Sequence, residues 1–428
     1  MSTPHTRKSR TALVGWLIAL SAVGYLLTLA TSASSLIPAL PAWAAVIFGW
    51  SMIGRSAKQQ SAILLILGLF LIIWAQLTGT PPAWQKSLIR NLPLLTMFVA
   101  VSFLALSSPP ERRESLPRGR KGIWSTLLTC HLLGAVINLS IVFVVGDRLS
   151  NSQRLSSSQL QVIMRSFCAA AFWSPFFIAI GVALTYAPGA RWQQLVLPGL
   201  MMTLPMFGLT FRDAWRGDGN NFSGYPLTRE SLVMPLFLAI MVLIGHQLLP
   251  TMKILTLISL LAPGGALLFM RERPRGPAIR HFINQRLANI SSQFALFLAA
   301  GVFSTGIGSL IASYPALMQF DLTGFTPLMF LLFSGVMILI ALLGVHPVVS
   351  IALVSPFLLP LGTNPNQLAF MFLIVWGVAT GSSPLSGVGL AMISRYHASS
   401  QQILKAHRYY LLLMWLMAGL VNILWFGK

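Results

Sequence analysis

The chain has 428 residues, of which 55% are hydrophobic and only 9% are charged, and its mean hydropathy is +0.76. A soluble domain carries about 25% charged residues, so this composition excludes an ordinary soluble protein and predicts an all-α polytopic membrane protein. Lys and Arg outnumber Asp and Glu by 29 to 8. We attribute the net charge of +21 to basic cytoplasmic loops, and we expect no nucleic-acid partner.

The apolar stretches predict about eleven transmembrane helices and, in addition, two re-entrant hairpins. The first helix starts with basic residues like a signal peptide, but it lacks a convincing cleavage site and is therefore expected to be retained. The predicted helices cover 12–30, 36–54, 61–78, 91–107, 161–186, 193–211, 231–250, 252–270, 293–313, 368–393 and 408–426, and the hairpins cover 123–150 and 325–361.

The positions of Lys and Arg predict the orientation. If the N-terminus is cytoplasmic and each hairpin enters and leaves on one side, all but five of the 29 basic residues lie on the cytoplasmic side. The five others are Lys86, Arg90, Arg191, Lys253 and Lys428. A complete crossing at 123–150 would place the later basic loops on alternating sides. The sequence thus predicts a multi-pass protein of a bacterial inner membrane with a cytoplasmic N-terminus and a periplasmic C-terminus.

Two kinds of interruption recur in the two halves of the chain. Each half has a Ser-Pro pair inside an apolar segment and, about 35 residues earlier, a polar interruption led by glycine. The matched positions are Gly134 and Gly344 and also Ser140 and Ser350, both 210 apart, and Ser174-Pro175 and Ser383-Pro384, 209 apart. Broken segments at matching places in two halves indicate a secondary transporter with its site at the repeat interface.

These elements predict four segments along the chain, with the two repeats inverted because repeat one starts outside and repeat two starts inside. They are an N-terminal three-helix segment (1–90), repeat one (91–211, with hairpin 123–150 and broken helix 161–186), connecting helices with a basic cytoplasmic linker (212–292), and repeat two (293–428, with hairpin 325–361 and broken helix 368–393).

Proline lacks an N–H and clashes with the carbonyl four residues earlier, so Pro175 should free the carbonyl of Ala171, and Pro384 that of Thr380. Freed carbonyls and hydroxyls suit a cation, whereas the N-termini of half-helices suit an anion. A simple kink remains an alternative, because Pro and Gly are common in membrane helices. The predicted solute- or ion-binding residues are Asn138, Ser140, Ser174, His346, Ser350, Thr380, Ser382 and Ser383.

Ionisable residues restrict the chemistry further. Asp147 is the one acidic residue near a broken segment, which disfavours a carboxylate proton relay. Arg165 is expected to pair with an anionic substrate or to extend toward the membrane interface. Among histidines, His346 is favoured over His131 as a functional group. No metal-ligand spacing and no phosphate-binding loop is present, so we expect no catalytic metal and no cofactor beyond a coupling ion, Na⁺ or H⁺.

The stretch from Gly344 to Phe357, followed by Trp376–Gly387, resembles the second hairpin and broken helix of the ion transporter superfamily, which includes divalent-anion symporters, citrate and gluconate permeases, arsenite exporters and the large subunits of tripartite transporters. The resemblance implies two opposed hairpins near the membrane centre, an elevator-type homodimer and a small anionic solute. The Ser-Asn-Thr signature of the divalent-anion symporters is absent from both tips, so sodium coupling and dicarboxylate recognition do not carry over.

Two other functional classes remain open. A membrane enzyme acting on a lipid-linked substrate is compatible with many spans and basic loops, but such enzymes usually need a sizeable outer loop, and the outer loops predicted here are short. A non-transporting subunit of a membrane complex is the other alternative. The sequence favours a permease over both, and it therefore predicts that the chain is not an enzyme.

Overall fold

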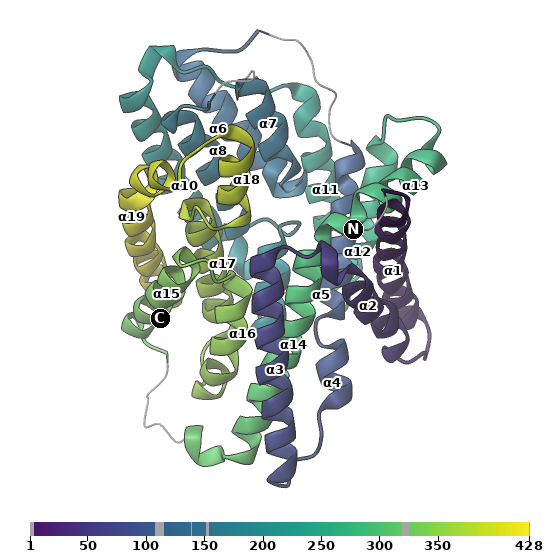
Figure 1. The fold of residues 1–428 in the computed structure, drawn as a ribbon. Helices are drawn as coiled ribbons and strands as arrows, with labels where there is room; N and C mark the ends of the chain where they lie inside the picture. Colours follow the sequence, from purple (N-terminus) through teal and green to yellow (C-terminus); the bar gives the residue numbers. More distant parts are fainter. Residues whose placement is uncertain (1–3, 108–114, 138, 151–153, 319–324, 428) are drawn as a thin grey trace. The chain divides into compact units, whose positions relative to one another are not determined.

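The computed structural model describes residues 4–107, 115–137, 139–150, 154–318 and 325–427 (Figure 1). Over these ranges the regular elements are helices and no strand is formed, which confirms the predicted all-α class. Seven of the helical segments are long and apolar enough to cross a membrane, and five shorter apolar helices accompany them. The protein is therefore a polytopic membrane protein. The chain divides into two compact units, which cut across the four segments predicted from the sequence.

Unit 1 comprises Met1–Ser107, Ile244–Thr323 and Ile351–Leu361. Its helices are α1 (Pro4–Ala30), α2 (Leu36–Gly49), α3 (Arg55–Leu77), α4 (Trp84–Ile89), α5 (Leu92–Ser102), α12 (Ile254–Phe269), α13 (Arg275–Gln285) and α14 (Ser291–Ser313).

Helices α3 and α14 of unit 1 cross closely at glycines. A Cβ atom added to Gly68 would lie 2.7 Å from the backbone of Phe303, and one added to Gly306 would lie 2.6 Å from the carbonyl oxygen of Gly68. Small residues let membrane helices approach this closely and gain dispersion energy where the hydrophobic effect offers little. The glycines of 301–308 thus include one that serves helix packing.

Unit 2 comprises Ser108–Leu243, Gly324–Ser350 and Gly362–Lys428. Its first half contains α6 (Gly119–Ile137), α7 (Ser140–Ser150), α8 (Ser157–Ala169), α9 (Ile178–Tyr186) and α10 (Trp192–Gly217). Its second half contains α15 (Pro327–Leu342), the start of α16 (Pro347–Leu358), α17 (Pro365–Ser382), α18 (Gly387–Tyr396) and α19 (Ser400–Phe426). Most of α11 (Arg229–Leu248) also belongs to this unit.

Along the chain, the two halves show the same order of elements: two helices joined by a short connection, a helix interrupted in the middle, and a long helix. In the second half, only the first residues of the second helix, α16, belong to unit 2. The interruptions fall at 173–177, between α8 and α9, and at 383–386, between α17 and α18. Both sites contain the Ser-Pro pairs from which the breaks were predicted. Interruption of both segments is therefore confirmed.

The predicted spacing of the two hairpin tips is wrong. Helix α6 ends at Ile137 and α15 at Leu342, 205 positions later; the partner helices begin 207 positions apart, at Ser140 and Pro347. The two glycines that set the predicted spacing have different roles. Gly344 lies in the tip with φ +96°, which favours glycine, whereas Gly134 is buried inside α6. Ser140 and Ser350 are therefore not equivalent positions.

Candidate functional site

The first break is built around Ser174 and Pro175. A short 3₁₀ turn, Ala170–Phe172, follows α8, and the chain then runs without helix until α9 begins at Ile178. Pro175 cannot donate a backbone hydrogen bond, which prevents a continuous helix through this point. The serine hydroxyl provides a local partner for the backbone at the break: its Oγ accepts a hydrogen bond from the Phe176 N–H at 3.2 Å.

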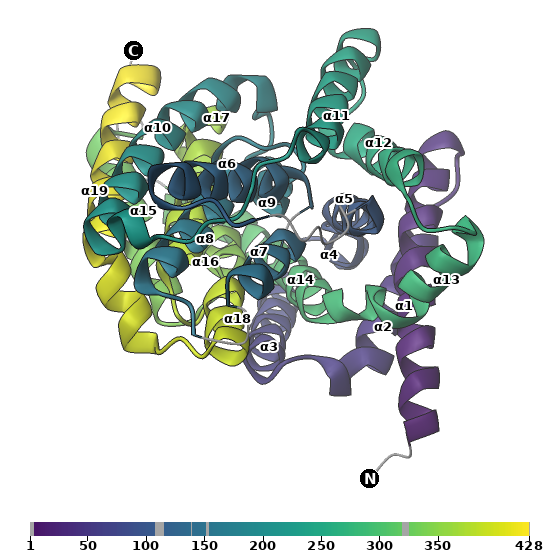
Figure 2. The same cartoon turned by 90° about the horizontal axis from the view of Figure 1, so that it is seen from above.

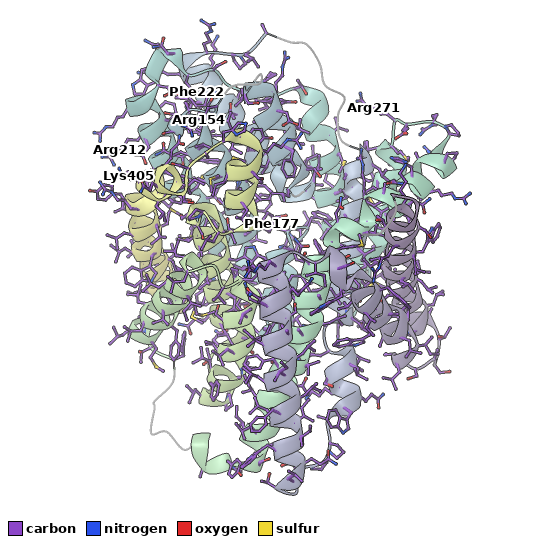
Figure 3. All side chains as sticks on the ribbon, in the orientation of Figure 1. Arg154, Phe177, Arg212, Phe222, Arg271 and Lys405 are labelled. Atoms are coloured by element: carbon purple, nitrogen blue, oxygen red, sulfur yellow. The ribbon has the colours of Figure 1, made fainter. Side chains whose placement is uncertain are left out.

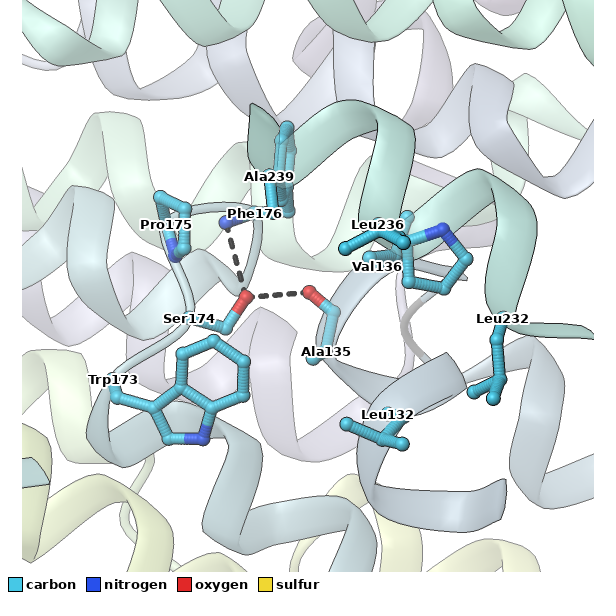
Figure 4. A pocket seen from close by; sticks show the side chains of 11 residues that line it. Leu132, Ala135, Val136, Trp173, Ser174, Pro175, Phe176, Leu232, Leu236 and Ala239 are labelled. Atoms are coloured by element: carbon cyan, nitrogen blue, oxygen red, sulfur yellow. Dashed lines mark hydrogen bonds between the residues drawn. The ribbon is translucent and has the colours of Figure 1, made fainter. Parts of the chain in front are cut away.

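Ser174 also joins the break to the hairpin of its own half. Its Oγ donates to the Ala135 carbonyl oxygen at 2.5 Å, within the last turn of α6 (Figure 4). Ser174 is 1% exposed, so neither bond competes strongly with water. One hydroxyl thus satisfies a donor of the break and an orphan carbonyl at the end of the hairpin helix.

Ser383 makes the corresponding bonds in the second half. Its Oγ accepts from the Leu385 N–H at 3.2 Å and lies 3.5 Å from the carbonyl oxygen of Ala341, in the last turn of α15. Ser174 and Ser383 are 209 positions apart, and Ala135 and Ala341 are 206 apart. The same side-chain link therefore occurs twice, and we call each one a serine latch.

The second break uses one further hydroxyl. Ser386 is the N-cap of α18 and accepts from the Gly389 N–H at 3.0 Å. Its Oγ lies 2.8 Å from the Thr380 carbonyl oxygen, which Pro384 was predicted to free from the helix, and 2.8 Å from the Ser383 carbonyl oxygen. The single hydroxyl proton is thus shared between these two carbonyls. In contrast, α9 begins after Phe177, which provides no side-chain cap.

The broken helices of the two halves cross each other at glycines of α17. A Cβ atom added to Gly377 would lie 2.5 Å from the Phe172 ring, and one added to Gly381 would lie 3.0 Å from Cβ of Cys168. The helices are antiparallel here, since the later residue of α17 meets the earlier residue of the first half. The offset of 209 that relates Ser174 to Ser383 also relates Phe172 to Gly381 and Cys168 to Gly377. The repeat therefore maps the contact between Gly377 and Phe172 onto the contact between Gly381 and Cys168.

Several predicted site residues satisfy their side chains locally. The Ser350 hydroxyl donates to the Pro347 carbonyl at 3.0 Å, and the Thr380 hydroxyl to the Trp376 carbonyl at 2.6 Å. The His346 Nδ1 accepts from the Val348 N–H at 3.3 Å, and its ring stands edge-on to that of Trp376 at 5.1 Å.

The other predicted residues have separate surroundings. Ser140 is half-buried at the start of α7, and Asn138 lies outside the described residues. Ser382, the last residue of α17, is buried with no partner for its hydroxyl among the described residues. The structure therefore places the described members of this set at the tips and breaks of unit 2, where solute binding by them stays a prediction.

Ionic contacts across unit 2 were not predicted. Asp147, in the second half of α7, accepts from Arg395 Nε at 2.8 Å and Nη2 at 2.5 Å and from the Tyr396 hydroxyl at 2.8 Å. This bidentate pair joins α7 to the end of α18. Their separation of 248 positions leaves no local sequence signal.

The predicted roles of Arg165 are both wrong. Its side chain is fully buried, and its Nη1 lies 2.8 Å from the Asp213 carboxylate on α10. It also donates to the Ala406 carbonyl at 2.6 Å and stacks 4.2 Å from the Tyr410 ring. Arg165 thus holds α8, α10 and α19 together through groups of the protein itself.

A cavity of 310 Å³ adjoins the first break (Figure 4). Its walls are apolar and come from the end of α6, from 173–176 and from α11. The Trp173 ring on this wall donates from Nε1 to His131 Nε2 at 3.0 Å, while His131 Nδ1 donates to the Ser166 carbonyl at 3.0 Å. His131 is thus fixed between two partners. The cavity suits the apolar part of a ligand, and none of the described side chains that line it is charged.

The fold has a solved counterpart. The YdaH transporter of Alcanivorax borkumensis, whose crystal structure was described as revealing an unusual topology, superposes with a TM-score of 0.58 at 13% sequence identity; the match covers 86% of this chain and 98% of that chain. No protein-family model and no curated protein matches the sequence. The likeness shows a shared fold, and membership of the ion transporter superfamily stays a prediction.

Proposed function

We propose that the chain is a secondary active transporter, a permease that moves a small anionic solute across the bacterial inner membrane by alternating access. The observation that carries this proposal is the antiparallel crossing of two interrupted helices. The same offset of 209 positions relates the two breaks and maps the two glycine contacts at the crossing onto each other. Irregular backbone at membrane depth is tolerated where it is buried in protein or lines a cavity. Paired breaks of this kind hold the solutes of many secondary transporters.

The fold supports the same function. Its solved counterpart is a transporter, and the match extends over nearly the whole of that chain. All the interrupted elements lie in unit 2, whereas unit 1 is built largely of helices such as α3 and α14 that cross at close-packed glycines. We therefore assign the carriage of the solute to unit 2 and a scaffold role to unit 1, in an elevator-type cycle.

An organic anion fits the first break best. The N-terminus of α9 has no side-chain cap, and the exposed N–H groups of a helix start favour negative charge. The apolar cavity beside the same break would accept the uncharged part of the solute. The proposed binding residues, tips and breaks together, remain Asn138, Ser140, Ser174, His346, Ser350, Thr380, Ser382 and Ser383.

A ligand-stabilisation screen tests this proposal. The purified chain is heated with carboxylates, inorganic oxyanions, neutral solutes and cations, each with and without Na⁺ and at two pH values. A bound solute raises apparent stability by mass action, by about 2.7 kcal/mol at a concentration 100 times its Kd. We expect an anion to shift the melting temperature, and the effect of Na⁺ or pH to identify the coupling ion.

Matched variants test whether the shift in melting temperature arises from binding at the proposed site. His346→Phe at the second tip should reduce the shift, whereas Gly208→Ala, on an open face of α10, should leave it unchanged. Stabilisation by cations or neutral solutes with none by anions would contradict the proposed solute class. The homodimer and the orientation, with cytoplasmic N-terminus and periplasmic C-terminus, stay predictions that a mass measurement and labelling of the two termini address.

A further inference from the structure

A second hollow in unit 2 has a different chemistry from the cavity at the first break. It measures 300 Å³ and lies where the ends of α15 and α17 meet the first turns of α19. Helices α15 and α19 contact each other within unit 2, where both are labelled in Figures 1 and 2. Three of its seven lining residues are leucines from α15 and α19, and the other four are Ser382, Lys405, His407 and Arg408.

Two polar atoms of the lining residues are buried without a hydrogen-bond partner among the described residues: the hydroxyl oxygen of Ser382 and Nε2 of His407. Each residue is 1% exposed. His407 Nδ1 lies 2.8 Å from the Ile403 carbonyl oxygen, which can only accept, so Nδ1 carries a proton. Nε2 of the neutral ring is then an acceptor that lacks a donor, and an unsatisfied buried polar atom carries a free-energy cost.

Two cations stand at the mouth of the hollow. Lys405 (Figure 3) and Arg408 are exposed and three residues apart, so they share one face of α19. Directly after them the exposed side chains of α19 become apolar, as at Leu412 and Leu416. A membrane helix changes in this way where it passes from the headgroup layer into hydrocarbon, and Lys and Arg at that level reach lipid phosphates.

We infer that this hollow binds the headgroup of an anionic phospholipid that carries a free hydroxyl, as phosphatidylglycerol does. The phosphate lies between Lys405 and Arg408. A glycerol hydroxyl donates to His407 Nε2 and accepts from the Ser382 hydroxyl. The first methylenes of the acyl chains contact Leu411. This inference concerns a lipid rather than the transported solute, and it does not rest on the proposed transport activity. It assigns Ser382, one of the residues proposed above for the solute, to the lipid headgroup.

Native mass spectrometry of the delipidated full-length protein tests the inference by titration with two lipids of equal charge. Phosphatidylglycerol carries the hydroxyls, and phosphatidylmethanol lacks them. We expect wild type to bind phosphatidylglycerol about tenfold more tightly, because one or two neutral hydrogen bonds distinguish the lipids. Ser382→Ala should reduce this preference several-fold. Equal binding of both lipids by wild type would overturn the role of the two buried atoms.

The charged part of the site has its own control. Lys405→Gln/Arg408→Gln should weaken phosphatidylglycerol binding about tenfold or more, whereas Arg275→Gln/Arg280→Gln, an equal charge loss on exposed positions of α13, should change it less than twofold. Equal effects of the two double variants would overturn the site. Soluble glycerol 1-phosphate should bind at least a hundredfold more weakly than the lipid. Binding as tight as the lipid's would show a phosphate-solute site instead.

Discussion

The serine latch at the first break gives the sharpest stability prediction. Ser174→Ala removes a hydroxyl that donates to the Ala135 carbonyl at 2.5 Å and accepts from the Phe176 N–H at 3.2 Å. Each neutral bond contributes about 1 kcal/mol, and an orphaned buried group costs about 1–3 kcal/mol. We therefore expect the variant to lose about 2–3 kcal/mol, concentrated where hairpin one meets the break.

Hydrogen exchange measured by mass spectrometry reads this loss locally. Peptides covering 131–137 and 176–182 should exchange about 30- to 140-fold faster in the variant, since 1.4 kcal/mol is a factor of ten. Peptides from unit 1 should be unaffected. Faster exchange in these two peptides alone indicates a local link, whereas faster exchange throughout the chain indicates a general loss of folding.

Ser350→Ala is the matched control. Ser350 is also buried, but its hydroxyl donates to the carbonyl of Pro347 on its own helix, where a backbone N–H can also serve. The control should lose less than about 0.5 kcal/mol. If Ser174→Ala exchanges no faster than Ser350→Ala, the latch does not hold the hairpin and the reasoning fails.

Two further substitutions follow from the same geometry. Ser383→Ala should cost about 1 kcal/mol, less than its counterpart in the first half, because its hydroxyl lies 3.5 Å from the Ala341 carbonyl; equal losses of melting temperature for both serines would contradict this ranking. Gly377→Ala should cost about 1–3 kcal/mol, since the new methyl would lie 2.5 Å from the Phe172 ring. Its control, Gly208→Ala on an open helical face, should stabilise by about 0.5–1 kcal/mol in the same thermal-unfolding assay, and a stable Gly377→Ala protein would refute the close crossing.

The sequence predicted the breaks because their cause is local. A proline inside an apolar segment removes a donor whatever surrounds it, and a serine beside it offers the backbone another partner. The freed carbonyl of Thr380 was predicted from Pro384 alone, and the structure shows it 2.8 Å from the Ser386 hydroxyl. Recurrence of the Ser-Pro pair at one offset then identified the corresponding helices of the two halves.

The partners of these residues were not predictable, because they depend on tertiary packing. The bond of Ser174 to the Ala135 carbonyl, 39 positions away, was not predicted. The tip spacing was wrong because a glycine in a turn and a glycine at a close helix contact look alike in sequence. A Cβ atom on Gly134 would lie 2.8 Å from the Phe167 ring. Burial of Arg165 required Asp213, 48 positions away, and no periodicity connects the two.

Solute counterflow tests the central claim most directly. Proteoliposomes loaded with the unlabelled anion found by the stabilisation screen are diluted into a trace of labelled anion without an ion gradient. Alternating access predicts a transient accumulation of label above equilibrium, saturable in the external solute and absent from protein-free liposomes. Slow equilibration without an overshoot by correctly folded wild-type protein, across every anion tested, would contradict the account.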